Sequence, residues 1–313
     1  MAAADPLFSI AGTMDQSRDY GRVLEAFDAA DADATSLTLF WDMLEVGGVY
    51  QPEPDWPAIA NASYPQTGLQ ISLMISVIDT VADRRPADLQ ALPFSDPVVI
   101  ARFDAFLSSV LRAMPDIRLT SIGIGNEVDG YLRGGGWEDY GAFFVAAKRV
   151  AVRERPGVPV GMTLTWGGLR DNPQAQALAR RGDVWMINHY PLASDFSVLP
   201  VAQTAVDLDA MLQLASPQQV YLTETGYPSG GCDATETGQR DYVVATWDFA
   251  QANARRMPLV NFVWLHDLSE AEVASYTSYY GVRSDCFARY LATLGLRTLD
   301  GRDKPAFAWM RNR

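Results

Sequence analysis

The chain has 313 residues, of which 48% are hydrophobic and 20% charged, so it is long enough to bury a sizeable core. Its formal net charge of −13 argues against nucleic acid and anionic membrane surfaces as partners, because both would repel it. The sequence has no unbroken apolar run of about 18 residues, so no membrane span is expected. Two histidines and two distant cysteines form no cluster with zinc spacing, so neither a metal nor another cofactor is expected.

Short apolar runs of β type alternate with segments of helical period along the chain, which is typical of parallel β/α units. The predicted strands cover 7–12, 36–41, 69–78, 122–127, 160–166, 184–190, 220–224 and 259–265. The predicted helices cover 19–34, 97–114, 140–151, 172–181, 201–215, 238–256 and 284–295. Asp96 and Pro97 provide a cap and a first turn for the second of these helices.

This alternation predicts a (β/α)8 TIM barrel, which we expect to form a single catalytic domain over residues 1–313. A doubly wound open sheet is the alternative, but it would place a glycine-rich phosphate turn after the first strand, and Ile10–Asp15 is not one. The long segments that follow strands are expected to be extended and to lie on the face of the barrel that carries active sites. They are 42–66, 80–96, 191–200 and 266–283.

Two glutamates end strand-like runs, Glu127 on the fourth predicted strand and Glu224 on the seventh. A carboxylate at the tip of a buried strand is costly unless it is paired or has a function. In a barrel these two strands stand on opposite sides of the mouth, so their carboxyls could face each other. Such a pair suits acetal cleavage, with one carboxylic acid as proton donor and one carboxylate as nucleophile. The alternative for each is a structural role at a helix N-terminus or in a salt bridge.

The pair Asn126-Glu127, together with Thr223–Ser229, resembles the retaining glycoside hydrolases of clan A. The seventh-strand segment and Asn188–Pro191 look most similar to the endo-β-1,3-glucanases of that clan and, next, to its endo-β-1,4-galactanases. The end of the chain, Gly295–Ala306, is similar to an ending common in the clan. Many members carry an arginine near the end of strand two, whereas Leu37–Asp42 has none.

The resemblance implies a role for each matching residue. Glu127 would be the acid/base and Glu224 the nucleophile. Asn126 would bind the sugar hydroxyl next to the reacting carbon, and Tyr190 would donate its phenol to the Glu224 carboxylate. Trp264 would form the floor under the sugar at the cleavage point.

Further candidates lie at or beyond predicted strand ends. Aromatic side chains there could stack on sugar rings, although each could instead pack in the core or against a loop. They are Trp41, Tyr50, Trp56, Trp137 and Trp166. His189 could contact a sugar hydroxyl or make a structural hydrogen bond. The carboxylates near strand ends could bind hydroxyls or be solvated, and they are Asp42, Asp129 and Asp267.

The predicted function is a retaining glycoside hydrolase that cleaves β-glycosidic bonds of a neutral poly- or oligosaccharide. We expect a monomeric endo-enzyme with an open groove and a neutral glycan as its partner. The alternative is a non-catalytic carbohydrate-binding TIM barrel, which would have no use for an acid/nucleophile pair. An enolase-type or aldolase-type barrel would need metal-ligating carboxylates or a strand-end lysine, and neither Lys148 nor Lys304 ends a strand.

The two cysteines, Cys232 and Cys286, follow the seventh and eighth predicted strands. Because the loops after these strands are neighbours in a barrel, a disulfide between them is predicted, with two unrelated thiols as the alternative. A disulfide implies an oxidising compartment, so a secreted or periplasmic location is expected. The start of the chain, Met-Ala-Ala-Ala-Asp-Pro, has no signal-peptide pattern, and a cytoplasmic location stays open.

Overall fold

The computed structural model describes residues 5–313, so most of the start of the chain that bears on a signal peptide lies outside it. The strands are β1 (Leu7–Ile10), β2 (Ala34–Phe40), β3 (Glu45–Val46), β4 (Val49–Tyr50), β5 (Gln70–Asp79), β6 (Ala82–Asp83), β7 (Leu119–Asn126), β8 (Val160–Gly161), β9 (Thr163–Thr165), β10 (Trp185–His189), β11 (Val220–Thr225) and β12 (Leu259–Phe262).

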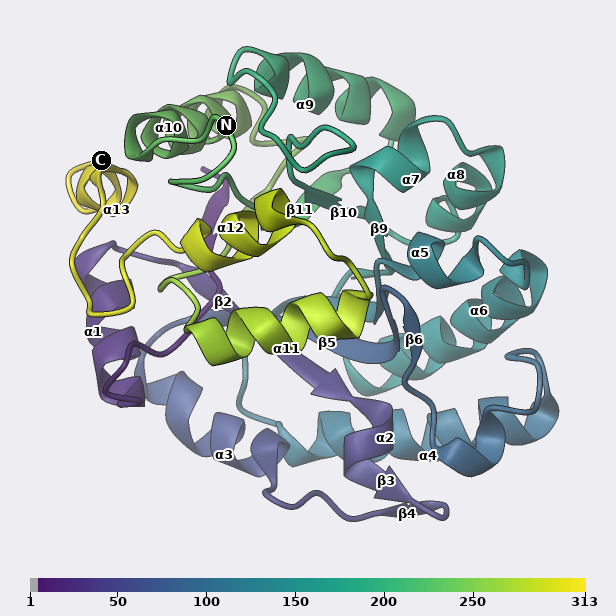
Figure 1. Ribbon diagram of the computed structural model, residues 1–313. Helices are drawn as coiled ribbons and strands as arrows, with labels where there is room; N and C mark the ends of the chain where they lie inside the picture. Colours follow the sequence, from purple (N-terminus) through teal and green to yellow (C-terminus); the bar gives the residue numbers. More distant parts are fainter. Residues whose placement is uncertain (1–4) are drawn as a thin grey trace. The chain divides into compact units, whose positions relative to one another are not determined.

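The helices bear the labels used in Figure 1. They are α1 (Tyr20–Ala29), α2 (Trp41–Leu44), α3 (Trp56–Ser63), α4 (Pro97–Ala113), α5 (Val128–Leu132), α6 (Trp137–Glu154), α7 (Trp166–Arg170), α8 (Pro173–Ala179), α9 (Gln203–Ala215), α10 (Glu236–Ala252), α11 (Glu270–Tyr280), α12 (Asp285–Thr293) and α13 (Pro305–Met310). Two short 3-10 helices cover Tyr64–Gln66 and Ala87–Leu89. Within residues 5–313, no helix has the length and apolar character needed to cross a membrane.

The main sheet has the strand order β8-β7-β5-β2-β1-β12-β11-β10-β9, with β6 beside β5. The first strand of this order, β8, and the last, β9, are separated in the sequence only by Met162. They therefore form one interrupted strand, and the sheet closes on itself. Each barrel strand lies beside the next one in the sequence, which is the arrangement of a (β/α)8 TIM barrel. The predicted fold class is confirmed, and the doubly wound alternative is excluded because it reverses the strand order at a switch point.

Three of the four segments expected to be extended contain secondary structure, so that expectation is wrong for them. Segment 42–66 includes the β3–β4 hairpin and α3, 80–96 contains β6 and a short 3-10 helix, and 266–283 contains α11. The α11 sequence has no clear apolar period. A signal for it did exist, because Ser269 and Glu272 form a capping box at its start.

The contacts of the chain divide it into two compact units. The first contains the chain up to Thr35, His189–Ser216 and Leu222–Arg313, and the second contains Ser36–Asn188 and Pro217–Tyr221. The single catalytic domain predicted over residues 1–313 stays a prediction.

In the second unit, α4 and α6 pack against each other through aromatic side chains. Asp96 caps α4 as predicted, accepting a hydrogen bond from the Val98 backbone N–H, and Pro97 occupies the first turn. The ring centroids of Phe103 and Phe143 lie 4.8 Å apart. Trp41 and Phe94 add further ring contacts to this layer.

In the first unit, α10 packs against α9 and α13. The predicted helix over 284–295 is present as α12, but the chain continues to α13, a further helix that the sequence analysis missed. Helix α12 packs with α11, and the two lie side by side in Figure 1. They share an apolar cluster that includes Val263, Phe287 and Leu291.

Candidate active site

The chain turns sharply at the end of β7, where Glu127 stands. Gly125 has φ 83°, and a Cβ there would lie 2.5 Å from the Tyr140 hydroxyl, so only glycine fits. Glu127 itself has a left-handed backbone, with φ 45° and ψ 46°. Such a conformation is uncommon for a residue with a side chain and is often found at functional sites.

The Glu127 carboxyl is held by two hydrogen bonds from within the second unit. Thr80 Oγ1 donates to Oε2 at 2.8 Å, and Asn188 Nδ2 donates to Oε1 at 3.1 Å. Burial raises the pKa of Glu127, the two hydrogen bonds oppose the rise, and the nearby Asp129 and Asp79 carboxyls add to it. A carboxyl of this kind keeps its proton at a higher pH than a free glutamic acid and is suited to donate it.

Asn126, the residue before Glu127, forms hydrogen bonds with both the nitrogen and the oxygen of its side-chain amide. Its Nδ2 donates to Asp79 Oδ1 at 3.1 Å, and its Oδ1 accepts from Asn188 Nδ2 at 3.3 Å. These contacts set the orientation of the amide beside Glu127. Asn188 therefore contacts both members of the Asn-Glu pair.

Asp129 has a structural role instead of being solvated or free to bind a hydroxyl. It is buried, and its carboxylate accepts from the Thr165 backbone N–H at 2.8 Å and from Thr165 Oγ1 at 2.7 Å. Burial raises the pKa of Asp129, and the hydrogen bonds from Thr165 oppose the rise. Asp129 thus ties α5 to the end of β9.

Glu224 stands near the end of β11 in the first unit. The Tyr190 hydroxyl donates to its Oε2 at 2.7 Å, which is the contact that the resemblance implies. A donor to a carboxylate favours its ionised form and fixes its direction. Tyr190 directly follows β10, so the bond links the ends of two neighbouring strands.

His189 is corrected from a substrate contact to a structural residue. The side chain is 1% exposed, with Nδ1 2.9 Å from the Tyr242 hydroxyl and Nε2 3.2 Å from Asp207 Oδ2. Tyr242 also hydrogen-bonds Thr225 Oγ1 at 2.5 Å. Since both ring nitrogens have protein partners, this network fixes the strand ends that carry Tyr190 and Glu224. The sequence does not reveal this network, because Asp207 and Tyr242 lie on helices far along the chain.

Trp41 is likewise corrected from a sugar-stacking residue to a core residue. Its ring is fully buried, with the Phe103 and Phe106 rings at centroid distances of 4.9 and 5.7 Å. Its Nε1 donates to Glu45 Oε2 at 2.6 Å. No face of this ring is open to a sugar.

Trp166 is 7% exposed, so it offers no open face for stacking, and that prediction is corrected too. Its Nε1 is buried and has no hydrogen-bond partner in the part of the chain that the structure describes. Of the other candidate aromatics, Trp137 is buried, Trp56 is 49% exposed, and Tyr50 packs against Phe106.

Trp264 directly follows β12 and is half-buried. Its ring centroid lies 5.6 Å from that of Tyr276 on α11, with 31° between the planes. The peptide bond between Val263 and Trp264 is cis. The role of Trp264 as a sugar floor stays a prediction.

The end of β2 has an arginine nearby, although the sequence has none at 37–42. Arg84, which follows β6, lies over the Phe40 ring at 4.5 Å and pairs with Asp42 at 3.0 Å. Burial raises the pKa of Asp42, and the charge of Arg84 opposes the rise. Arg84 could not be predicted from the strand-two sequence, because it comes from a different segment.

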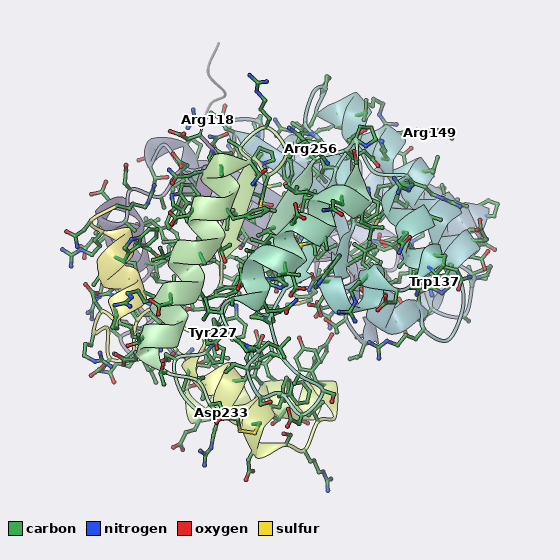
Figure 2. All side chains as sticks on the ribbon, turned by 90° about the horizontal axis from the view of Figure 1, so that it is seen from above. Arg118, Trp137, Arg149, Tyr227, Asp233 and Arg256 are labelled. Carbon is green, nitrogen blue, oxygen red and sulfur yellow. A yellow bond between two sulfur atoms is a disulfide. The ribbon has the colours of Figure 1, made fainter. Side chains whose placement is uncertain are left out.

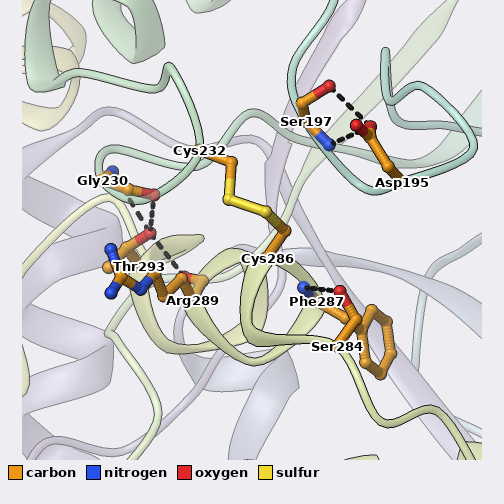
Figure 3. Close-up of a disulfide and its surroundings, with 9 residues drawn as sticks. All are labelled: Asp195, Ser197, Gly230, Cys232, Ser284, Cys286, Phe287, Arg289 and Thr293. Atoms are coloured by element: carbon orange, nitrogen blue, oxygen red, sulfur yellow. Dashed lines mark hydrogen bonds between the residues drawn. A yellow bond between two sulfur atoms is a disulfide. The ribbon is translucent and has the colours of Figure 1, made fainter.

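The predicted disulfide is confirmed, since Cys232 and Cys286 are bonded with their Cα atoms 5.5 Å apart. Figure 3 shows the bridge joining the segment after β11 to the start of α12, and Figure 2 labels Asp233, the residue that follows Cys232. Thr293 at the end of α12 strengthens the connection, because its Oγ1 donates to the Gly230 carbonyl at 2.9 Å.

Lys304 is buried and links the segments that follow β11 and β12. Its Nζ lies 2.6 Å from Asp267 Oδ1, 2.8 Å from Ser229 Oγ and 2.7 Å from the Gly295 carbonyl. Asp267 is therefore paired inside the protein instead of being solvated. Across residues 5–313, no three His, Cys, Asp or Glu side chains gather closely enough to hold a metal ion.

No protein-family model and no curated protein sequence matches the chain. Solved structures do match in fold. A GH5_18 variant from Streptomyces cattleya, in complex with Manβ1-4GlcNAc, has a TM-score of 0.74 at 19% identity, covering 98% of this chain and 80% of its own. A family 39 glycoside hydrolase from Bacteroides cellulosilyticus WH2 has a TM-score of 0.70 at 14% identity, covering 97% and 62%.

A third match is the exo-β-1,4-mannosidase Op5Man5 from Opitutaceae bacterium strain TAV5, with a TM-score of 0.76 at 14% identity, covering 98% of this chain and 59% of its own. The closer likeness to endo-β-1,3-glucanases and endo-β-1,4-galactanases is not confirmed by these matches. The resemblance to clan A is confirmed in fold, because this chain shares its barrel with solved glycoside hydrolases of that clan.

Proposed function

We propose that the protein is a retaining glycoside hydrolase that cleaves β-glycosidic bonds of a neutral oligo- or polysaccharide. The observation that carries the proposal is the unequal surroundings of two strand-end glutamates. Burial and neighbouring carboxyls raise the pKa of Glu127, whereas a phenol donates to Glu224. Two carboxyls whose surroundings differ in this way are suited to the two roles of a glycosidase.

In the first step, Glu127 gives its proton to the leaving oxygen while Glu224 attacks the anomeric carbon from the opposite face. The glycosidic bond breaks, and a covalent bond between the sugar and Glu224 forms. In the second step, the Glu127 carboxylate takes a proton from water, which attacks the same carbon and releases Glu224. Two inversions give net retention. The mechanism requires the two carboxyls to lie about 5 Å apart across the mouth of the barrel.

Asn126 and Tyr190 assist these steps in the proposal. The Asn126 amide, held by Asp79 and Asn188, would bind the hydroxyl next to the reacting carbon. This contact strengthens as charge develops in the transition state. Tyr190 keeps the Glu224 carboxylate ionised and aimed.

The solved neighbours guide the choice of substrates. One is described as an exo-β-1,4-mannosidase, and another is in complex with Manβ1-4GlcNAc. We therefore include β-mannosides beside β-glucosides and β-galactosides. A monomeric state remains our proposal. A secreted or periplasmic location is also proposed and is supported by the disulfide, which is stable in oxidising compartments.

The test is hydrolysis of a panel of 4-nitrophenyl β-glycosides and β-linked oligosaccharides by the wild-type protein and by Glu127→Gln and Glu224→Gln. Glu138→Gln, which changes an exposed glutamate paired with Arg181, is the matched control. We expect hydrolysis by the wild type and the control, and loss of turnover in Glu224→Gln. Full activity of Glu224→Gln, or no hydrolysis of any substrate by the wild type, would contradict the proposal.

A further inference from the structure

Six aromatic rings form a continuous row whose two ends directly follow β12 and β10, the strands on either side of β11. We call this row the aromatic wall, and its members are Trp264, Tyr276, Tyr280, Phe287, Tyr290 and Tyr190. The successive centroid distances are 5.6, 6.3, 5.6, 6.0 and 5.7 Å. Every link lies within the contact range of aromatic pairs.

Both ends of the aromatic wall are placed by the nucleophile strand. At one end, the Tyr190 hydroxyl donates to Glu224 Oε2 at 2.7 Å. At the other end, Trp264 follows Val263, whose backbone N–H donates to the Thr225 carbonyl at 3.0 Å. The wall therefore begins at Trp264, on the β12 side of Glu224, and continues through residues of α11 and α12. It ends at Tyr190, on the β10 side of Glu224.

Several contacts hold the aromatic wall in place. The Cys232–Cys286 disulfide and the Thr293–Gly230 hydrogen bonds join α12 to the segment after β11. Val273, Tyr276 and Tyr280 of α11 pack on the apolar cluster shared with α12. The Tyr276 ring also packs against the Trp264 ring, with 31° between the planes. A wall fixed at both ends and along its length is not a loose loop and can bound a site at Glu224.

The chemistry decides which part of a substrate meets this boundary. Glu224 bonds to the sugar on the non-reducing side of the cleaved bond, and the leaving group departs toward the acid. A wall around Glu224 therefore limits the length of chain that extends from the non-reducing side of that sugar.

Resting on the proposed function, we infer that the aromatic wall makes the protein an exo-acting glycosidase that removes short units from the non-reducing end of a β-linked glycan. This replaces the open groove of the endo-enzyme expected from the sequence. Tyr276 and Tyr280 on α11 are the residues that set the limit.

The first test is the product pattern of the wild-type protein. The probes are reducing-end-labelled β-linked oligosaccharides of three to six units, built from the sugar that is cleaved best in the panel. We expect the labelled fragment to shorten stepwise from the non-reducing end. Internal fragments among the first products would overturn the inference while leaving the proposed function intact. The absence of hydrolysis on every probe would instead contradict the proposed function.

The second test uses Tyr276→Ala and Tyr280→Ala, with Ser275→Ala on the exposed side of α11 as control. The measured quantity is the ratio of kcat/KM for a 4-nitrophenyl β-disaccharide to that for the β-monosaccharide. Removing a ring of the wall should raise this ratio roughly fivefold or more, and the control should leave it unchanged. A ratio unchanged in folded Tyr276→Ala and Tyr280→Ala, checked by circular dichroism, would contradict the assignment of these residues.

Discussion

Glu127 and Glu224 occupy equivalent strand ends but meet different neighbours. Around Glu127 stand two other carboxyls, Asp79 and Asp129, together with the neutral donors Thr80 and Asn188. Glu224 has the Tyr190 phenol within 2.7 Å. The different surroundings of the two glutamates thus come from residues on other strands and loops.

Glu127→Gln tests the effect of burial on this carboxyl. Because its pKa is raised in the folded protein, the folded state keeps a proton that the unfolded chain has already lost. The stability that Glu127 contributes is therefore full below the ordinary carboxyl pKa and falls as pH rises toward the raised value. Glutamine stays neutral and keeps the hydrogen-bonding shape. The stability of the variant relative to the wild type should therefore be higher at pH 7 than at pH 4. Urea unfolding of both proteins at the two pH values measures this, and the same difference in the free energy of unfolding at pH 4 and pH 7 would contradict it.

Tyr190→Phe removes the phenol and keeps the ring in the aromatic wall. A hydrogen bond to a charged group contributes about 1.5–3 kcal/mol, so kcat should fall by roughly 10- to 150-fold. Tyr227→Phe is the matched control, since that phenol donates to the Leu199 carbonyl at 3.2 Å. Equal effects of the two substitutions on kcat would show that Tyr190 has no special relation to Glu224.

At the scale of elements, α12 depends on a covalent bond as well as on packing. The bond between Cys232 and Cys286 closes a loop over a separation of 54 residues. In the chain-entropy model, a loop of this length contributes about 4 kcal/mol to the free energy of unfolding. The double substitution of both cysteines by serine should lower the denaturant midpoint accordingly, and a reducing agent should lower that of the wild type only. Titration of two free thiols in the denatured, unreduced wild type would rule the bond out.

Lys304 provides a second test of how the segments after β11 and β12 are held. Lys304→Met leaves the Asp267 carboxylate buried without its cation, and breaking a buried pair costs about 3–5 kcal/mol. Lys304→Met/Asp267→Asn removes the charge as well and should recover part of the loss. Chemical unfolding compares the two variants, and a double variant less stable than the single one would argue against the pair.

The sequence predicted the strands well because each barrel strand is a short apolar run bounded by polar turns. It predicted α11 poorly because that helix packs through tyrosines and one valine, and no residue of it is buried. Helix α13 was missed because it is only six residues long. The spacing of apolar residues is thus informative for buried strands and long helices. It is much less informative for short helices and for helices with no buried residue.

For the whole molecule, the strand order follows directly from the alternation of strands and helices, since consecutive β/α units place each strand beside the next. The site was predictable only where its residues adjoin strand ends in the sequence, as Asn126, Glu127, Tyr190 and Glu224 do. The partners that define their chemistry come from remote segments, and Thr80 is the clearest case. Trp41 and His189 look like site residues in sequence, but the fold buries both of them.

The most direct measurement of the central claim is trapping of the covalent intermediate. A 2-deoxy-2-fluoro glycoside with a good leaving group, built on the best sugar of the panel, slows the second step more than the first. The protein incubated with it should gain the mass of one fluorosugar, and peptide mass spectrometry should place that mass on Glu224. A protein that hydrolyses the parent glycoside but carries the label elsewhere, or releases product with inverted configuration by NMR, would contradict the account.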